Sequence, residues 1–541
     1  MAERSSLLAP FRYETFRLLW LATLVSNLGG LVQSVGAGWM MTTLTDSHNM
    51  VALVQASTTL PIMVFSLAAG ALADNFDRRT VMIVAQGGMM IVSLALAAMA
   101  ILGLLNPWLL LAFTFLIGCG TALFNPSWQA SMGDIVPRSD LPGAVTLNSV
   151  GFNMMRSVGP AIGGLIVALA SAGAAFAFNA LSYIPLIVAL VRWKPVRPVS
   201  KLPRESFGSA MWAGVRYVAL SPNLTIVLFR GMLFGLAAIS ILALLPSVAS
   251  EYVGGGALVY GTLLGCFGLG AIGGAFLNER VRERYSNEVI VRLASVGFAI
   301  ACVGLGFSRD VLLSHLALLP AGACWVLSLS LFNVSIQLSS PRWVVGRALS
   351  LYQTATFGGM AAGSWIWGAT ADAFGPDWAL ATAGVVLLAC AVVGLRLPLP
   401  QFNTHDLNPL NTFSEPILRL DLRPRSGPIM VMVDYRIDQA DIPRFLALMA
   451  DRRRIRRRDG ARQWALLRDL EQPDLWVESY HVPTWIDYVR HNMRRTKADA
   501  DNVEQLRALH RGPDLPKAHR MIERQTVPLN DDTPLRDSPE V

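Results

Sequence analysis

The sequence predicts an all-α membrane protein of twelve spans, followed by a small domain that mixes helices and strands. The chain has 541 residues, of which 53% are hydrophobic and 15% are charged, whereas about a quarter of the residues are charged in a soluble globular chain. Apolar runs of about 20 residues, long enough to cross a bilayer, recur between residues 17 and 396. About half of the 45 Lys and Arg residues follow residue 397, where no such run occurs.

Backbone polar groups inside lipid must be paired within their own segment, so each apolar run is expected to be a helix. The predicted spans are residues 17–41, 50–73, 79–104, 107–129, 144–170, 173–191, 223–249, 256–278, 288–306, 311–336, 344–370 and 376–396. The chain then divides into a first six-helix half (1–191), a linker (192–222), a second six-helix half (223–397), a second linker (398–427), a folded domain (428–530) and a disordered tail (531–541).

The positions of Lys and Arg predict the orientation. With the N-terminus in the cytoplasm, the loops on the outer side carry one of these residues, Arg309, whereas the inner side carries many, among them Arg78, Arg79 and Arg138. This asymmetry satisfies the positive-inside rule and places both termini in the cytoplasm. The first span is expected to be an uncleaved anchor, because eleven more spans follow it. We expect a multi-pass protein of the bacterial inner membrane, in contact with the lipid bilayer.

The two halves repeat each other. An offset of 204 residues relates Gly70 to Gly274, Asp74 to Asn278, Gly159 to Gly363, and Gly164 to Gly368. Arg280 follows the second copy as Arg78 and Arg79 follow the first. Because each half has an even number of spans, both halves cross the membrane in the same direction and are related by an axis along the membrane normal, as in major facilitator transporters.

Two motifs carry the resemblance to that superfamily. The stretch "GALADNFDRR" resembles its signature between spans 2 and 3 through Gly70, Asp74, Arg78 and Arg79, whereas Asn75 and Asp77 depart from it. The stretch "GPAIGG" resembles the end of the span 5 antiporter signature through four residues, which are Gly159, Pro160, Gly163 and Gly164.

The stretch "FRLLWLATLVSNLGG", taken with "ALADNFDRR", is similar to the subgroup that contains the enterobactin exporter, the transmembrane secretion effectors. This resemblance implies a secondary active transporter that exports a small organic molecule, siderophore-like or drug-like, by alternating access. It also implies proton antiport, for which the spans supply no obvious carboxylate. Thr114 stands where the family has an Arg in span 4, and Gly30 stands where relatives often have an acid.

Each motif has two open roles. Asp74 can pair with the other half and close the cytoplasmic side in one state, or the charges around it can simply fix the orientation. Gly274, Asn278 and Arg280 repeat the motif in weakened form. The glycines of span 5 can seal the contact between the halves, or they can serve ordinary close packing of helices.

Charges within spans are costly and therefore informative. Arg156 lies about 18 Å along span 5 at 1.5 Å per residue, and its repeat partner is Met360. Our leading hypothesis is that Arg156 faces a central cavity and contacts an anionic or carbonyl-rich substrate, or a carboxylate partner. The alternative is that it is tied to span-end carbonyls. Arg230 lies only about 10 Å into span 7 and can snorkel. Five further residues either line the cavity or bond to a neighbouring helix: Asn27, Gln33, Asn148, Asn153 and Gln353.

From residue 428 the pattern predicts strands and helices in the order βαββαβ, a ferredoxin-like unit. This domain resembles the dimeric α+β barrels of antibiotic-biosynthesis monooxygenases, so we expect it to dimerise. The run Arg452–Arg458 is expected to cover a solvated helix end or to touch anionic lipid. We find no metal, cofactor or nucleic-acid motif and no catalytic residue. An enzyme or ligand sensor that works through this domain is therefore the alternative, and a transporter that is not an enzyme is the leading prediction.

Overall fold

The computed structural model describes residues 8–75, 77–137, 140–194, 207–341, 343–400, 407, 410, 413 and 415–523. The chain forms two compact units. The helical unit comprises Met1–Phe207, Ile226–Ile336 and Leu349–Gln401, and the sheet unit comprises Gly208–Thr225, Gln337–Ala348 and Phe402–Val541. The predicted disordered tail, residues 531–541, lies outside the described residues.

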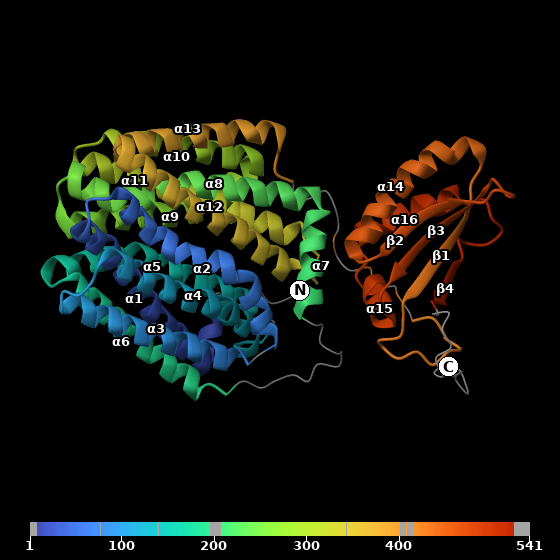
Figure 1. The fold of residues 1–541 in the computed structure, drawn as a ribbon, viewed down its shortest axis with the longest axis horizontal. Coiled ribbons are helices and arrows are strands. Elements are labelled where there is room, and N and C mark those ends of the chain that lie inside the picture. The colour runs from blue at the N-terminus through green and yellow to red at the C-terminus, as the bar shows by residue number, and fades with distance from the viewer. Residues whose placement is uncertain are drawn as a thin grey trace. The chain divides into compact units, whose positions relative to one another are not determined.

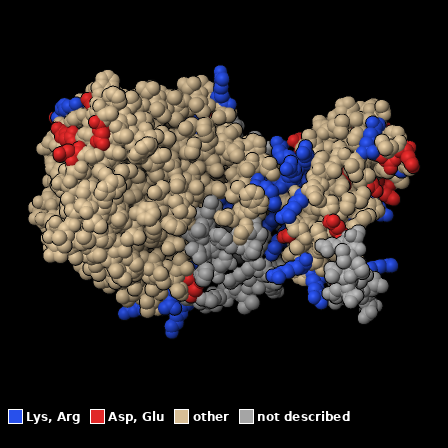
Figure 2. Space-filling model, viewed as in Figure 1, with Lys and Arg blue, Asp and Glu red and all other residues tan. Residues whose placement is uncertain are grey.

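Twelve long helices of the described chain correspond to the twelve predicted spans. They are α1 (Glu14–Leu44), α2 (His48–Asn75), α3 (Arg78–Ile101), α4 (Pro107–Ile135), α5 (Leu141–Leu169), α6 (Ala172–Arg192), α8 (Pro222–Ser247), α9 (Gly256–Arg284), α10 (Asn287–Phe307), α11 (Val311–Leu338), α12 (Val345–Phe374) and α13 (Pro376–Arg396). In Figure 1, α1–α6 form one group, in blue to teal, and α8–α13 form the other, in green to gold. The broad face of these helices is almost free of charged side chains (Figure 2), as contact with lipid requires.

Eleven of these helices, within the described residues, are long and apolar enough to cross a membrane. The exception, α12, has sufficient length, but its sequence contains several polar side chains and five glycines. Its glycines explain how such a helix is accommodated. Gly359 and Gly363 face the backbone of α8, and Gly368 faces Asn49 and Ala52 of α2. Because α12 packs between two other helices, it needs less apolar surface than a helix that faces lipid on several sides.

Side-chain caps mark several helix starts. Asn106 accepts a hydrogen bond from the backbone of Leu109 at the start of α4. Ser171 and Ser286 do the same for α6 and α10. Each such cap stabilises a helix by about 1 kcal/mol, so the short loops between spans are fixed by local sequence.

A buried polar network joins α1, α3 and α6. The Gln33 side-chain oxygen accepts hydrogen bonds from Ser93, at 3.0 Å, and from the side-chain amide of Asn179. Asn179 also donates to the hydroxyl of Tyr183 at 3.0 Å. A network whose members are all paired is tolerated inside a membrane and fixes how the helices pack.

The sheet unit contains one antiparallel sheet with the strand order β2-β3-β1-β4. Its strands are β1 (Ile429–Arg436), β2 (Arg462–Arg468), β3 (Leu475–Val482) and β4 (Ala518–Ile522), and its later helices are α14 (Ile442–Asp459), α15 (Trp485–Met493) and α16 (Lys497–Leu509). The predicted order βαββαβ was therefore wrong by one helix, because α15 and α16 both precede β4. A capping box between Thr496 and Asp499 starts α16.

The first linker, predicted as residues 192–222, contains the helix α7 (Phe207–Ala219), which belongs to the sheet unit. Within this unit the Arg458 guanidinium lies 4.9 Å from the centre of the Tyr217 ring. The Tyr217 ring meets that of Trp343 edge to face at 5.4 Å, and Arg494 lies 4.1 Å above Trp343. Residues from three separate stretches of the chain thus share one set of aromatic and cationic contacts.

Candidate functional site

The predicted gating motif lies where α2 is followed by α3. Gly70 and Asp74 occupy the last turns of α2, and the surroundings of the Asp74 side chain lie outside the described part of the structure. Arg78, at the start of α3, forms an ion pair with Asp134 of α4 at 3.0 Å. A contact of Asp74 with the second half therefore stays a prediction.

Arg79 caps the end of another helix. Its guanidinium donates hydrogen bonds to the carbonyl oxygens of Leu190 and Val191, at 2.8 and 2.6 Å, in the last turn of α6. A cation at this position also interacts favourably with the helix dipole. Arg78 and Arg79 together join α3 to α4 and α6, all within the first half.

The second copy of the motif packs α9 against α11. A Cβ on Gly274 would lie 2.7 Å from the Cα of Ala323, so only a glycine fits here without a shift. Asn278 donates a hydrogen bond to the hydroxyl of Ser330 at 3.2 Å. Arg280 is exposed in the last turns of α9. This copy thus holds two helices of the second half together.

Two glycines of the span 5 motif face α1. A Cβ on Gly159 would lie 2.8 Å from the Cβ of Leu31, and one on Gly163 would lie 3.0 Å from the Cα of Val32. Pro160 lies within α5. These residues allow α1 and α5 to approach closely within the first half.

Gly164 instead faces the second half. A Cβ on Gly164 would lie 2.9 Å from the Cα of Gly261 in α9. Farther along the same pair of helices, a Cβ on Gly268 would lie 2.6 Å from the backbone oxygen of Arg156. The helices α5 and α9 therefore touch backbone to backbone across the two halves.

A second contact between the halves joins α12 to α2 and to the loop before it. The carboxylate of Asp372 accepts hydrogen bonds from the Ser47 hydroxyl, at 2.9 Å, and from the Asn49 backbone, at 3.2 Å. Toward the other end of α2, the hydroxyls of Ser66 and Thr354 lie 2.7 Å apart. Polar groups therefore join this pair of helices near both of its ends.

Arg156 lies between the halves on the same α5 surface. Its guanidinium lies 5.7 Å from the centre of the Phe267 ring and 5.8 Å from that of Trp325, on α9 and α11. Among the described residues, no carboxylate is close enough to pair with it. The arginine is thus held by rings of the second half rather than by an opposite charge.

Arg230 has a different environment. It is 4% exposed and pairs with Glu288 of α10, which also accepts a hydrogen bond from the backbone of Leu399 at 2.9 Å. Arg230 donates a further hydrogen bond to the carbonyl oxygen of Leu397 at 3.2 Å. A Cβ on Gly394 would collide with Glu288 and would lie 2.8 Å from the Arg230 guanidinium. These contacts fasten the end of α13 to α8 and α10, so they lend no support to a substrate role.

Three of the predicted polar residues bond to neighbouring groups. Gln33 belongs to the buried network described above. Asn148 accepts a hydrogen bond from the indole of Trp128 at 3.0 Å, and Asn153 donates to the backbone oxygen of Ser149 at 2.9 Å.

The two remaining residues, Asn27 and Gln353, are partly buried on α1 and α12. Neither side chain makes a hydrogen bond within the described part of the chain. Both therefore keep their amide groups available, as a residue that contacts substrate requires.

The sheet unit contains a basic cluster that was not predicted from the sequence. Arg452 and Arg456 of α14 are buried, 5% and 3% exposed, and both pair with Glu478 of β3. The expectation that Arg452–Arg458 covers a solvated helix end was therefore wrong for these two residues. Their four-residue spacing on the same face as Phe445 and Met449 was the available signal. No group of three or more His, Cys, Asp or Glu residues in the described chain is placed to hold a metal.

Residues 5–526 match the family of transmembrane secretion effectors. The chain is similar to the staphyloferrin A transporter of Staphylococcus aureus, with 25% identity over 53% of this chain and 72% of the relative. It is similar to the enterobactin exporter EntS of Shigella dysenteriae, with 25% identity over 70% of this chain and 91% of the relative.

The crystal structure of the nucleoside transporter NupG shares the fold. Its TM-score is 0.57 with 12% identity, over 71% of this chain and 99% of that chain. The family match, over residues 5–526, includes the twelve long helices and the strands of the sheet unit. The chain belongs to the transmembrane secretion effectors, a family of small-molecule exporters of the major facilitator superfamily, and is a transporter rather than an enzyme.

Proposed function

We propose that this protein exports a small organic anion, siderophore-like or drug-like, across the bacterial inner membrane by alternating access. The observation that carries the proposal is Arg156, a cation inside a span that faces Phe267 and Trp325 and has no carboxylate partner among the described residues. A partly buried cation without a counterion inside a span favours an anionic ligand, because the ligand supplies the missing charge.

The names of relatives support the substrate class. The staphyloferrin A transporter and the enterobactin exporter are both named for siderophores. An aromatic siderophore also suits the rings near Arg156, where Phe234, Phe298 and Phe332 extend the cluster around Trp325. Aromatic surfaces favour flat rings, and the arginine favours acidic groups.

The contacts between the halves support alternating access. Gly164 and Gly261 form one contact, and Asp372 with Ser47 and Asn49 forms the other. We propose that these contacts separate in the opposite state of the cycle, and that Gly70, Asp74 and the arginines after them close the cytoplasmic side there. Both termini then lie in the cytoplasm, as the distribution of Lys and Arg favours.

Proton coupling belongs to the same proposal. The carboxylate of Asp372 joins the two halves through its hydrogen bonds to Ser47 and Asn49. Protonation removes its negative charge and weakens both hydrogen bonds, because charge-assisted bonds are the stronger kind. A proton on Asp372 therefore favours separation of α12 from the α1–α2 loop.

The test is transport by the purified protein in liposomes with an imposed proton gradient. Enterobactin and staphyloferrin A are the siderophore probes, and ethidium is the cationic control. We expect gradient-dependent movement of at least one of the two siderophores and slower movement of ethidium. Preference for ethidium would contradict the anionic substrate class, and transport that ignores the gradient would contradict proton coupling.

A further inference from the structure

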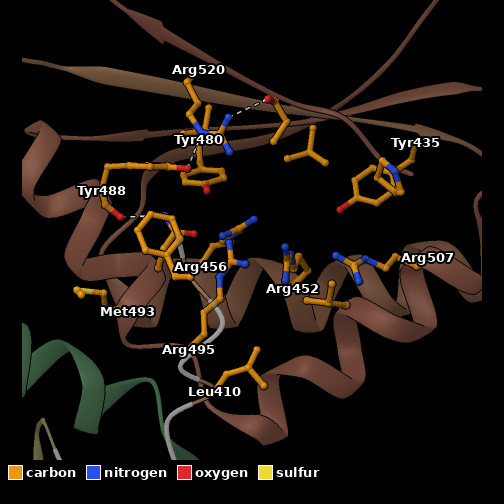
Figure 3. A pocket seen from close by; sticks show the side chains of 17 residues that line it. Leu410, Tyr435, Arg452, Arg456, Tyr480, Tyr488, Met493, Arg495, Arg507 and Arg520 are labelled. Atoms are coloured by element: carbon orange, nitrogen blue, oxygen red, sulfur yellow. Dashed lines mark hydrogen bonds between the residues drawn. The ribbon is translucent and has the colours of Figure 1, made fainter. Parts of the chain in front are cut away.

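The sheet unit encloses a cavity of about 470 Å³. Its roof is the inner face of the sheet, with Val431 and Val433 of β1, and its other walls come from α14, α15 and α16 (Figure 3). This volume lies in the range of about 300–1,000 Å³ that is typical of small-molecule sites. Export of a substrate through the helical unit makes no use of this cavity.

Positive charge dominates the cavity wall. Five arginines line it: Arg452, Arg456, Arg495, Arg507 and Arg520. Figure 3 shows their side chains coming from both the helices and the sheet. The cavity-lining residues include no Asp or Glu, so the cavity carries a large excess of positive charge.

One buried acid, Glu478, lies behind the wall and balances part of this charge. It pairs with Arg456 at 3.0 Å and with Arg452 at 3.5 Å. Burial alone would raise the pKa of Glu478, but the charges of Arg456 and Arg452 outweigh burial and lower that pKa to about 2. Glu478 therefore supplies one negative charge to two arginines.

Two acids near the adjoining side of the cavity are already engaged. Asp459 and Asp499 both pair with Arg458, at 2.9 and 3.0 Å. Asp499 also accepts hydrogen bonds from Thr496 in the capping box of α16. These acids are committed to Arg458 and to the helix start, so they do not neutralise the arginines of the cavity.

Arg495 is a cavity arginine whose charge is not balanced by a neighbouring acid. Its guanidinium forms no ion pair or hydrogen bond within the part of the chain that the structure describes. Burial, together with the charges of Arg456 and Arg452, lowers the pKa of Arg495 to about 10. Arg495 is therefore charged at neutral pH, and an anion beside it would relieve the repulsion.

Tyrosine rings supply flat surfaces on the same wall. The Arg456 guanidinium lies 4.3 Å from the centre of the Tyr480 ring. The Tyr488 hydroxyl accepts a hydrogen bond from Arg520 at 2.6 Å. Tyr435, near the C-terminal end of β1, also lines the cavity (Figure 3). Aromatic faces beside arginines suit a ligand that is both flat and anionic.

We propose that this cavity binds a small organic anion that carries an aromatic ring. The oxyanion lies between Arg495, Arg452 and Arg507, and the ring lies against Tyr480 and Tyr488. This ligand site is additional to the transport pathway, and no chemical step is assigned to it.

The test is calorimetric titration of the full-length protein in detergent with naphthalene-2-carboxylate. The neutral naphthalene-2-carboxamide has nearly the same shape and isolates the role of charge. We expect the carboxylate to bind at least tenfold more tightly, because a hydrogen bond to a charged group is worth about 1.5–3 kcal/mol. Added salt should weaken carboxylate binding more than amide binding.

Four variants locate the site. Arg495→Gln and Arg507→Gln should each weaken carboxylate binding about tenfold or more, and neither removes a partner of Glu478. Arg444→Gln is the matched control, because Arg444 is exposed on α14 and does not line the cavity. Arg156→Met tests whether the probe binds the transport pathway, because a site there would be lost in this variant while binding in the cavity of the sheet unit is retained.

Several results would overturn the proposal: no binding of the carboxylate, equal binding of the two compounds, or parental affinity in both Arg495→Gln and Arg507→Gln. Loss of binding in Arg156→Met with parental affinity in Arg495→Gln would move the anion site to the helical unit. That result would support the proposed transport function while it contradicts this inference, so the two proposals fail separately.

Discussion

Gly164 of α5 and Gly261 of α9 touch backbone to backbone: a Cβ on Gly261 would lie 2.7 Å from the Cα of Gly164. One residue belongs to the first half of the transporter and the other to the second. The span 5 glycines were predicted from their resemblance to an antiporter signature, and the geometry now gives Gly164 a specific partner. Any side chain at either position must push the halves apart.

We expect Gly164→Ala to slow transport without reducing the amount of protein in the membrane. Overpacking costs about 1–3 kcal/mol, and the cost falls only on the state in which α5 and α9 touch. The balance between the two states should therefore shift about 5- to 150-fold. Transport rate per molecule, measured in liposomes, checks this expectation.

Gly273→Ala is the matched control, because a Cβ on Gly273 of α9 would meet no atom within 4 Å. Its transport rate should equal that of the parent. If Gly164→Ala also transports at the parental rate, the contact between the glycines does not limit the cycle.

We expect Asp74→Asn to leave the protein inserted and to slow transport. A neutral amide accepts weaker hydrogen bonds than a carboxylate, so a gate contact made in one state would weaken. Asp134→Asn is the comparison: Asp134 pairs with Arg78 at 3.0 Å within the first half, and partly exposed ion pairs contribute about 0–1 kcal/mol. Equal transport rates in the parent and both variants would favour the view that these charges only fix the orientation.

The twelve spans could be predicted because lipid imposes a length and a composition on each helix. The helices α7 and α16 could not be found in this way. In α16 the apolar residues are few, and the helix start is set by the capping box of Thr496 and Asp499. The prediction therefore missed α16 because a local capping contact, and not burial in lipid, determines where this helix begins.

The arginines of α14 show a second limit. Six arginines between residues 452 and 458 are typical of a solvated helix face. Arg452 and Arg456 are nevertheless buried, since Glu478 reaches them from β3. That acid lies more than twenty residues away in the sequence, and only the pairing of strands brings it beneath the helix. The ion pair between Arg230 and Glu288 could not be predicted for the same reason, because α8 and α10 meet only in the folded protein.

We expect the sheet unit to lose stability as the pH falls below 6.5, and His491 to be one cause. Burial and the charges of Arg456 and Arg495 hold the pKa of His491 well below 6.5. Arg456 donates to Nε2 of the ring at 3.0 Å, so this nitrogen must be unprotonated. The unfolded chain binds a proton at His491 below pH 6.5 and the folded chain does not, so stability is full above pH 6.5 and falls on acidification.

The slope from this group is at most about 1.4 kcal/mol per pH unit. Hydrogen exchange of α15 in the full-length protein, followed from pH 7.5 to pH 5, measures it. His491→Gln keeps an acceptor for Arg456 and should flatten the dependence, whereas His519→Gln, at a partly exposed ring, should not. Parental pH dependence in His491→Gln would assign the slope to other groups.

We expect the full-length protein to dimerise through the outer face of the sheet. Leu467 and Met521 are 50% and 51% exposed on that face, and Val477 lies opposite Leu467 in the register of β2 and β3. Pairing two such faces would bury this apolar surface. Leu467→Glu should therefore shift the protein toward the monomer in sedimentation, while Leu470→Glu, in the turn after β2, should not. A monomeric parent would remove the barrel interpretation.

The last prediction compares Arg156 and Arg230, two arginines that lie within spans but have different neighbours. Arg230 pairs with Glu288, so Arg230→Met leaves a buried carboxylate without its partner. Loss of one member of a buried pair costs about 3–5 kcal/mol, and we expect this variant to be scarce in the membrane. Arg156 faces Phe267 and Trp325 and has no acid among its described neighbours.

Arg156→Met should therefore accumulate at least as well as the parent, because it removes a desolvated charge at the cost of a cation–π contact worth about 0.5–2 kcal/mol. If Arg156 binds the substrate, this variant should lose transport of enterobactin and staphyloferrin A about ten- to hundredfold, and ethidium transport should change less. Membrane abundance and substrate ranking, measured in the same cells, separate binding from folding. An abundant Arg156→Met variant with the parental rate and ranking would show that the arginine does not contact the substrate. Scarcity of this variant would show instead that the contact of Arg156 with the two rings stabilises the folded protein.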